Sequence, residues 1–86
     1  MAKIEIYTTP ICPYCLRAKQ YMDRQGLDYQ EVDVARDPER RQEMMQRSNG
    51  HTVPQIFIND KSIGGCDDLF YLAQTGELQD LLATND

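Results

Sequence analysis

Two cysteines, Cys12 and Cys15, are the residues of this sequence best suited to chemistry. They stand where an apolar segment gives way to a helical pattern, and cysteines three positions apart on the first helical turn lie within disulfide-bonding range. Cys12 would sit at the helix N-terminus, where unpaired N–H groups and the helix dipole favour a thiolate. Because the thiolate is the nucleophile of disulfide exchange, the pair predicts a reversible dithiol site.

Two other roles for the pair are less consistent with the sequence. A zinc site would need two further ligands, and the remaining soft candidates, His51 and Cys66, lack paired spacing. Two inert core cysteines would not explain why both stand at a strand-to-helix junction. We therefore expect no metal, and a C-x-x-C pair beside a strand–helix–strand pattern is typical of a thioredoxin-like redox site.

The elements around the cysteines follow that pattern. Residues 3–8 alternate apolar and polar side chains, which predicts a half-buried strand. Apolar residues recur at helical spacing over 13–25, and Gly26 follows at a typical helix end. Alternation returns over 27–34, where frequent charges suggest an edge strand. The two strands should be parallel and joined by a right-handed crossover.

A second helix is expected from Asp37 and Pro38, an N-cap followed by proline at the first helical position, to about residue 48. Only Met44 and Met45 are strongly apolar in it. This predicts the least buried helix of the chain, packed through one narrow stripe.

The last part of the chain predicts a hairpin followed by helices. Strands over 55–58 and 62–64 flank an Asn-Asp turn and should pair antiparallel. Asp67 or Asp68 is expected to cap the next helix, and a short terminal helix should lie around 78–82. The order of elements is then βαβαββα plus a small tail.

Length and charge narrow the function classes. The 86 residues have room for one domain, 1–86, with a modest core. A net charge of −5 argues against a nucleic-acid partner. The chain opens without a signal-like segment and has no apolar run long enough for a bilayer, so we expect a cytoplasmic protein and no membrane. No long apolar stripe is left over, which favours a monomer.

Two further segments carry weaker signals. Pro54, after Thr52-Val53, stands at the start of a strand and could follow a cis bond, although a trans turn is the default. Gly64-Gly65-Cys66-Asp67-Asp68 precedes a helix whose N–H groups could hold a carboxylate. Taken alone, that segment is more simply a glycine turn with an N-cap.

Together the three segments occur in the order and spacing of the glutaredoxins. The chain resembles the small bacterial dithiol glutaredoxins of the glutaredoxin-3-like kind over nearly its whole length, including the run Val53-Pro54-Gln55-Ile56-Phe57-Ile58. The resemblance implies an α/β, thioredoxin-like fold with a four-stranded mixed sheet flanked by helices.

The resemblance also implies a glutathione-dependent thiol–disulfide oxidoreductase, with Cys12 as nucleophile and Cys15 as resolving cysteine. Glutathione would be a co-substrate, with no tightly bound cofactor, and partners would be disulfide-containing or glutathionylated proteins, with ribonucleotide reductase as one candidate. Pro54 would be cis and face the thiols. The residues implied to bind glutathione beside Cys12 are Tyr14, Thr52, Val53, Pro54, Cys66, Asp67 and Asp68, with contacts from the Val53, Cys66 and Asp67 backbone and the Asp68 carboxylate.

One position departs from the family pattern. Many relatives carry a lysine three residues before the first active-site cysteine, where this chain has Thr9. Losing that cation should weaken glutathione binding and stabilise the Cys12 thiolate less. Arg17, Lys19 or an arginine of the second helix could substitute for it.

Two alternative functions stay open at this point. One is a glutaredoxin-like electron donor recycled by a thioredoxin reductase. The segment 64–68 argues against this function. The other is an iron–sulfur cluster carrier, which the Pro13-Tyr14 pair makes less favourable because cluster-binding relatives usually have smaller or monothiol active-site sequences.

Overall fold

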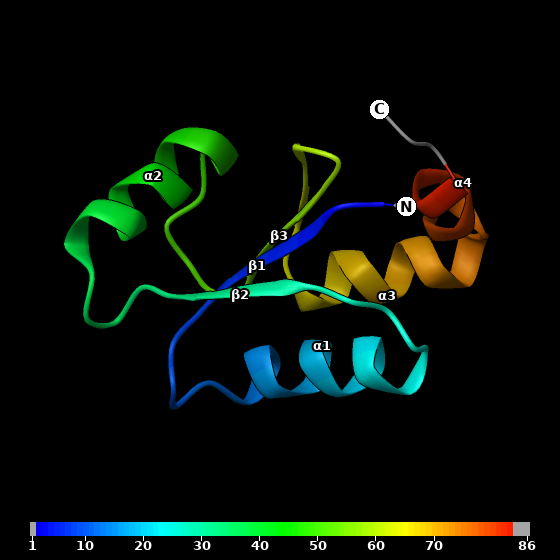
Figure 1. The fold of residues 1–86 in the computed structure, drawn as a ribbon, viewed down its shortest axis with the longest axis horizontal. Helices are drawn as coiled ribbons and strands as arrows, with labels where there is room; N and C mark the ends of the chain where they lie inside the picture. The colour runs from blue at the N-terminus through cyan, green and yellow to red at the C-terminus, as the bar shows by residue number, and fades with distance from the viewer. Residues whose placement is uncertain (1, 84–86) are drawn as a thin grey trace.

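The computed structural model describes residues 2–83. Four strands and four helices lie within this range (Figure 1). In chain order they are β1 (Ile4–Thr8), α1 (Pro13–Arg24), β2 (Gln30–Asp33), α2 (Pro38–Ser48), β3 (Gln55–Ile58), β4 (Lys61–Gly64), α3 (Cys66–Thr75) and α4 (Glu77–Ala83).

The strands form one mixed sheet in the order β2-β1-β3-β4. β1 is parallel to β2 and antiparallel to β3, and β3 pairs antiparallel with β4. The predicted mixed sheet, the parallel first pair, the hairpin and the edge position of β2 are therefore confirmed. The hairpin turn at Asn59 and Asp60 has φ of 52° and 67°, the left-handed backbone that two-residue hairpin turns require.

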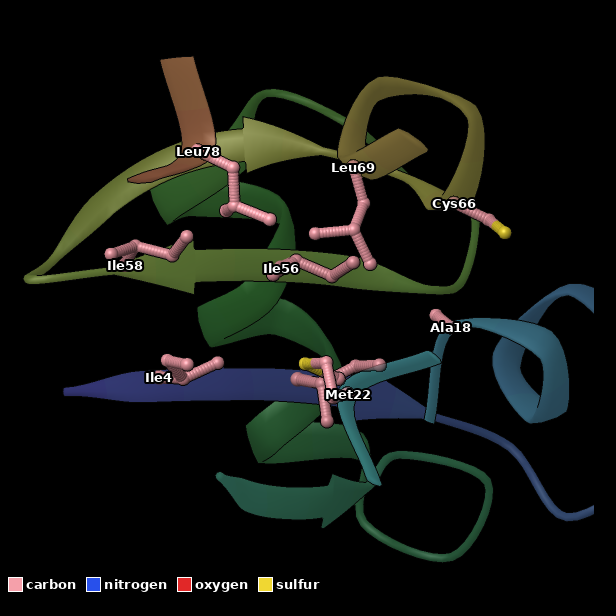
Figure 2. Close-up of a cluster of buried hydrophobic side chains, with 9 residues drawn as sticks. Ile4, Ala18, Met22, Ile56, Ile58, Cys66, Leu69 and Leu78 are labelled. Carbon is pink, nitrogen blue, oxygen red and sulfur yellow. The ribbon is translucent and has the colours of Figure 1, made fainter. Parts of the chain in front are cut away.

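Helices cover both faces of the sheet. α1 and α3 lie on one side and α2 lies on the other (Figure 1). The side of α1 and α3 holds the larger cluster of buried side chains, with Cys66 at one end of it (Figure 2). Its members are Ile4, Ile6, Ala18, Met22, Ile56, Ile58, Cys66, Leu69 and Leu78. The side of α2 holds Tyr7, Val32, Val34, Met44 and Phe57.

The prediction of a half-buried first strand is wrong, because every residue of β1 is buried. β1 lies in the interior of the sheet with helices on both sides, so its two faces pack into different clusters. Tyr7 is fully buried and meets the Phe57 ring edge-on, with ring centroids 5.5 Å apart. The charged Glu5 is only 9% exposed because Arg47 of α2 pairs with it.

The helix ends follow local capping rules. α1 ends at Arg24, and Gly26 beyond it has φ of +69°, the left-handed conformation typical of helix ends. The predicted cap of α2 is confirmed, since the Asp37 carboxylate accepts a hydrogen bond from the Arg40 N–H at 3.2 Å. The predicted stripe of α2 is narrower than expected, since Met44 is fully buried but Met45 is 36% exposed.

Two elements differ from the sequence prediction by more than one residue at a boundary. β2 begins at Gln30 and ends at Asp33, shorter than the expected 27–34. The N-cap of α3 is Gly65 and not Asp67 or Asp68, because the helix begins two residues earlier, at Cys66. A further irregularity is a register shift in the β3–β4 ladder between Ile56 and Phe57. Within residues 2–83, the helices are too short or too polar to cross a bilayer.

Candidate active site

The loop after β1 delivers Cys12 to the start of α1. Cys12 is the N-cap, with extended backbone (φ −148°, ψ 106°), and Pro13 follows at the first helical position. The Cys12 Sγ accepts a hydrogen bond from the Cys15 N–H at 3.3 Å, so the sulfur occupies the place of a capping oxygen. The predicted position of Cys12 at a helix N-terminus is confirmed. An N–H donor and the helix dipole both favour negative charge on this half-buried sulfur.

Cys15 lies one helical turn further in and is only 1% exposed. Burial raises the pKa of the Cys15 thiol to about 12, and a hydrogen bond to Cys12 acts in the same direction. The Thr9 backbone and the Lys19 charge act in the opposite direction and lower this pKa. Cys15 is therefore a protonated thiol at neutral pH, and the two cysteines differ in access to solvent.

A groove of about 400 Å³ lies next to Cys12, whose sulfur contacts the lining residue Val53. It contains all seven of the residues that the sequence implied for glutathione binding: Tyr14, Thr52, Val53, Pro54, Cys66, Asp67 and Asp68. These residues come from α1, the segment before β3 and the start of α3, which the sheet and the helices bring together. The structure thus gathers them in one place, and their contacts with a ligand stay predictions.

The segment Thr52–Pro54 forms the wall of the groove next to Cys12. The Cys12 thiol donates a hydrogen bond to the Val53 carbonyl oxygen over 3.8 Å, which ties the sulfur to this segment. The Val53–Pro54 peptide bond is cis, as the resemblance implied. Gln55, which is buried, donates from its Nε2 to the Thr52 carbonyl oxygen at 3.0 Å and supports the segment from β3.

The opposite wall is built around the start of α3. The Asp68 carboxylate accepts a hydrogen bond from the Gly65 N–H at 2.9 Å, so it folds back over the helix N-terminus. Gly64 has φ of +102°, and a Cβ there would lie 2.2 Å from the Asp68 Oδ2. Asp67 is exposed, whereas Cys66 is buried and burial raises the pKa of its thiol. This wall offers helix N–H groups and a carboxylate to a zwitterionic ligand.

The three candidate substitutes for a cation at Thr9 lie in different places. Lys19 forms an ion pair with Glu31, with Nζ and Oε2 2.8 Å apart. The Arg17 guanidinium lies 5.9 Å from the centre of the Tyr14 ring, within cation–π range. Arg41 of α2 donates to the His51 carbonyl oxygen at 3.3 Å, next to the Thr52 end of the groove.

Sequence reasoning missed several groove residues. They are Ser48, Gly50, Gln55 and Ser62, whereas Gly64 and Gly65 belong to a segment that the sequence had singled out. Extending the two segments by two residues on each side would have found all of them except Ser48. Ser48 carried no signal. Among residues 2–83, no three or more His, Cys, Asp or Glu side chains gather closely enough to hold a metal ion.

Comparison with known proteins agrees with this architecture. The family model described as glutaredoxin matches residues 4–63. The chain is 49% identical to glutaredoxin 3 of Escherichia coli strain K12 over 82 residues, which cover 95% of this chain and 99% of that protein.

Two solved structures have the same fold. The solution structure of glutaredoxin from Brucella melitensis has a TM-score of 0.85 and 48% identity, and covers 100% of this chain and 94% of its own. The crystal structure of the buckwheat glutaredoxin–glutathione complex has a TM-score of 0.84 and 29% identity, covering 92% and 74%. The predicted thioredoxin-like fold is confirmed.

Proposed function

Because the chain belongs to the glutaredoxin family, we propose that it is a glutathione-dependent thiol–disulfide oxidoreductase with Cys12 as nucleophile and Cys15 as resolving cysteine. The observation that carries the proposal is the asymmetry of the two thiols beside the groove. The Cys12 sulfur is half buried at a helix N-terminus, whereas Cys15 is buried and protonated. One sulfur is thus suited to attack and the other to act only after the first has reacted.

The first reaction uses Cys12 alone. Its thiolate attacks the glutathione sulfur of a mixed disulfide, so the Cys12–glutathione disulfide forms and the substrate leaves as a thiolate that takes up a proton. A second glutathione, as its thiolate, then attacks the glutathione sulfur of that intermediate. Oxidised glutathione leaves and the Cys12 thiolate returns. The net reaction consumes one free glutathione, because the other half of the oxidised glutathione comes from the mixed disulfide itself.

The second reaction needs both cysteines. Cys12 attacks a disulfide of a protein substrate and forms a mixed disulfide with one of its sulfurs. Cys15 loses its proton and attacks the Cys12 Sγ, which releases the substrate as a dithiol and leaves a Cys12–Cys15 disulfide. Two glutathione molecules then reduce that disulfide in sequence. Disulfide-containing proteins are therefore the proposed protein substrates, with ribonucleotide reductase as one candidate.

The groove carries polar groups that match the charges of glutathione. We assign the Val53 backbone to the cysteinyl part of the ligand, which would align its sulfur with Cys12. Its γ-glutamyl carboxylate would face the N–H groups of Cys66 and Asp67 at the start of α3, and its ammonium would face the Asp68 carboxylate. Support comes from the position of these groups along one groove and from the buckwheat relative, which was solved with glutathione.

The groove walls and a nearby arginine complete the proposed site. Tyr14, Thr52 and Pro54 would form the walls around the ligand. Arg41 is the cation we assign in place of the family lysine, because its guanidinium already lies at the Thr52 end of the groove. We place the activity in the cytoplasm, where thiols are kept reduced.

The test is NADPH-coupled reduction of a glutathione mixed disulfide in the presence of glutathione and glutathione reductase. Wild type should turn over, Cys12→Ser should be inactive, and Cys15→Ser should retain activity on the small mixed disulfide while failing to reduce a protein disulfide. Equal loss in both variants would contradict the division of roles. No turnover by wild type, with recovery on adding thioredoxin reductase, would favour the reductase-recycled donor instead.

A further inference from the structure

We propose that Lys19, anchored by Glu31, is a positioning residue for the resolving step, in which its charge favours the thiolate form of Cys15. This inference rests on the proposed function, because it concerns the reaction of Cys15 with a mixed disulfide at Cys12. It gives a role to Lys19 of α1 and Glu31 of β2, neither of which lines the glutathione groove.

The first observation is a second cavity of about 260 Å³ at the cysteine pair. It shares no lining residue with the groove and is lined by Thr9, Pro10, Ile11, Cys12, Pro13, Cys15, Leu16 and Lys19. Lys19 is four residues after Cys15 on α1, so the two side chains lie on the same face of the helix. The cavity therefore brings both sulfur-bearing side chains and one cationic side chain together.

The second observation is that the Lys19 ammonium is fixed in place. Its Nζ lies 2.8 Å from the Glu31 Oε2, and the Thr8 hydroxyl donates to the same oxygen at 2.7 Å. Thr8 is buried and the Lys19 side chain is 26% exposed. A partly buried charge, held by a carboxylate that Thr8 also fixes, is screened less by solvent than a free surface lysine.

The third observation is the balance of charges around Cys15. Burial raises its pKa, and the Lys19 charge opposes burial. In return, Cys15 is among the groups that raise the pKa of Lys19, together with Glu31 and Tyr29, so Lys19 stays charged across the neutral range. Tyr29 itself is hydrogen-bonded to Asp23.

The resolving step explains why this charge matters. After Cys12 has formed a disulfide with glutathione, its sulfur carries no negative charge and no longer opposes ionisation of Cys15. Cys15 gives its proton to solvent, and its thiolate attacks the Cys12 Sγ. The Cys12–Cys15 bond forms, the bond to glutathione breaks, and glutathione leaves as a thiolate that takes up a proton. The rate at neutral pH follows the small fraction of Cys15 present as thiolate.

A tenfold change in that fraction changes the rate by only about threefold, because nucleophilicity falls as thiolate becomes easier to form. Lys19 is the weakest of the influences that act on the Cys15 pKa, so removing its charge should slow resolution at pH 7 by up to about threefold. It should also move the midpoint of the pH–rate profile upward. The first attack, by Cys12, depends on a different sulfur held by the N-terminus of α1.

The test follows the reduced protein after mixing with excess oxidised glutathione, by acid quench and mass spectrometry from pH 6 to 10. The first phase gains one glutathione at Cys12, and the second loses it as the internal disulfide forms. Lys19→Met keeps the apolar stem and removes the charge, and it should slow the second phase. Lys19→Arg should restore most of the rate, and Gln20→Met, an exposed neighbour on α1, should match wild type.

Glu31→Gln gives a result of opposite sign. It keeps an acceptor for Lys19 and Thr8 but removes the negative charge, so the second phase should be faster than in wild type. Circular dichroism of each variant verifies the fold.

An unchanged second phase and pH profile in Lys19→Met would overturn the inference. So would an Arg variant as slow as the Met variant, since that would indicate shape and not charge, or an equal slowing of both phases. These results differ from failure of the proposed function, in which wild type would not take up glutathione at Cys12 at all.

Discussion

Arg47 of α2 reaches the buried strand β1 and pairs with Glu5, with its Nη2 3.1 Å from the Glu5 Oε1. The same guanidinium lies 4.0 Å above the centre of the Phe57 ring and donates to the Tyr7 hydroxyl at 2.7 Å. The carboxylate of Glu5 can therefore be buried in the sheet because a cation from the helix meets it there. α2 is held to the sheet by this polar contact as well as by Met44.

Replacing Arg47 with methionine should destabilise the fold. The change leaves the buried Glu5 carboxylate without its nearest cation, and removing one member of a buried pair typically costs about 3–5 kcal/mol. Because the Arg47 side chain is 25% exposed, we expect a smaller cost, about 2 kcal/mol. Urea unfolding followed by far-UV circular dichroism measures this, since the chain has no tryptophan.

Lys3→Met is the matched control. Lys3 pairs with Asp60 at 2.9 Å and lies 3.9 Å from the Glu5 Oε1, but the side chains of Lys3 and Asp60 are more than half exposed. It should leave the unfolding midpoint unchanged. Equal effects of the two substitutions would show that burial does not distinguish the two ion pairs.

Stability of the reduced protein should fall at alkaline pH because of Cys15. Its pKa is raised to about 12 in the folded state, above the value of about 8.5 for a free thiol, so folding favours the protonated form. This contribution is fully present below pH 8.5 and is lost as pH rises toward 12. Between pH 8 and 10, reduced wild type should lose more stability than reduced Cys15→Ala. Parallel curves from urea unfolding would contradict a raised thiol pKa.

Gly64→Ala should disturb both the backbone and the groove. Gly64 has φ of +102°, and the added Cβ would lie 2.2 Å from the Asp68 Oδ2, which must then leave the Gly65 N–H. We expect a loss of about 2 kcal/mol from the strained backbone and a higher KM for the glutathione mixed disulfide.

Gly26→Ala separates backbone strain from the groove effect. Gly26 also has positive φ, +69°, but a Cβ there meets nothing within 4 Å. It should cost about 1 kcal/mol and leave KM unchanged. An unchanged KM in Gly64→Ala as well would remove the Asp68 carboxylate from the proposed binding site.

Asp68→Asn tests the charge of that carboxylate directly. The amide oxygen can still accept from the Gly65 N–H, so the helix start should persist, but the attraction to an ammonium is lost. KM for the mixed disulfide should rise about fivefold, with kcat nearly unchanged, and the effect should shrink at high salt. Asp28→Asn makes the same charge change at an exposed site far from the groove, and it should behave as wild type.

The order of the elements was predictable because it depends on local patterns. Asp37 and Pro38 identify the start of α2, and the hydrophobic periods alternate between strand and helix along the chain. The burial of β1 was not predictable in this way. Glu5 looks solvent-exposed in sequence because its partner, Arg47, lies 42 residues away and meets it only after α2 has packed. Short-range alternation cannot encode such a contact.

In the active site, too, local patterns were predictable and long-range contacts were not. Cys12 and Cys15 were found from spacing, and the other named groove residues from their family resemblance. Lys19 was weighed only as a cation near Cys12, because its pairing with Glu31 depends on β2 lying beside α1. The sequence prediction placed the start of α3 too late because it assumed that an acidic residue precedes the helix as its N-cap. In the structure Asp68 lies inside the helix, and its carboxylate accepts from the N–H of the true N-cap, Gly65.

The two outer strands also bear on how the protein behaves at high concentration. β2 and β4 are each four residues long, β2 exposes Glu31 and Asp33, and β4 begins at the exposed Lys61. The ladder next to β4 is also irregular between Ile56 and Phe57. Short, charged and irregular edges are poor templates for strands of other chains. The sheet is thereby protected from growing into aggregates, although its interior strands are strongly apolar.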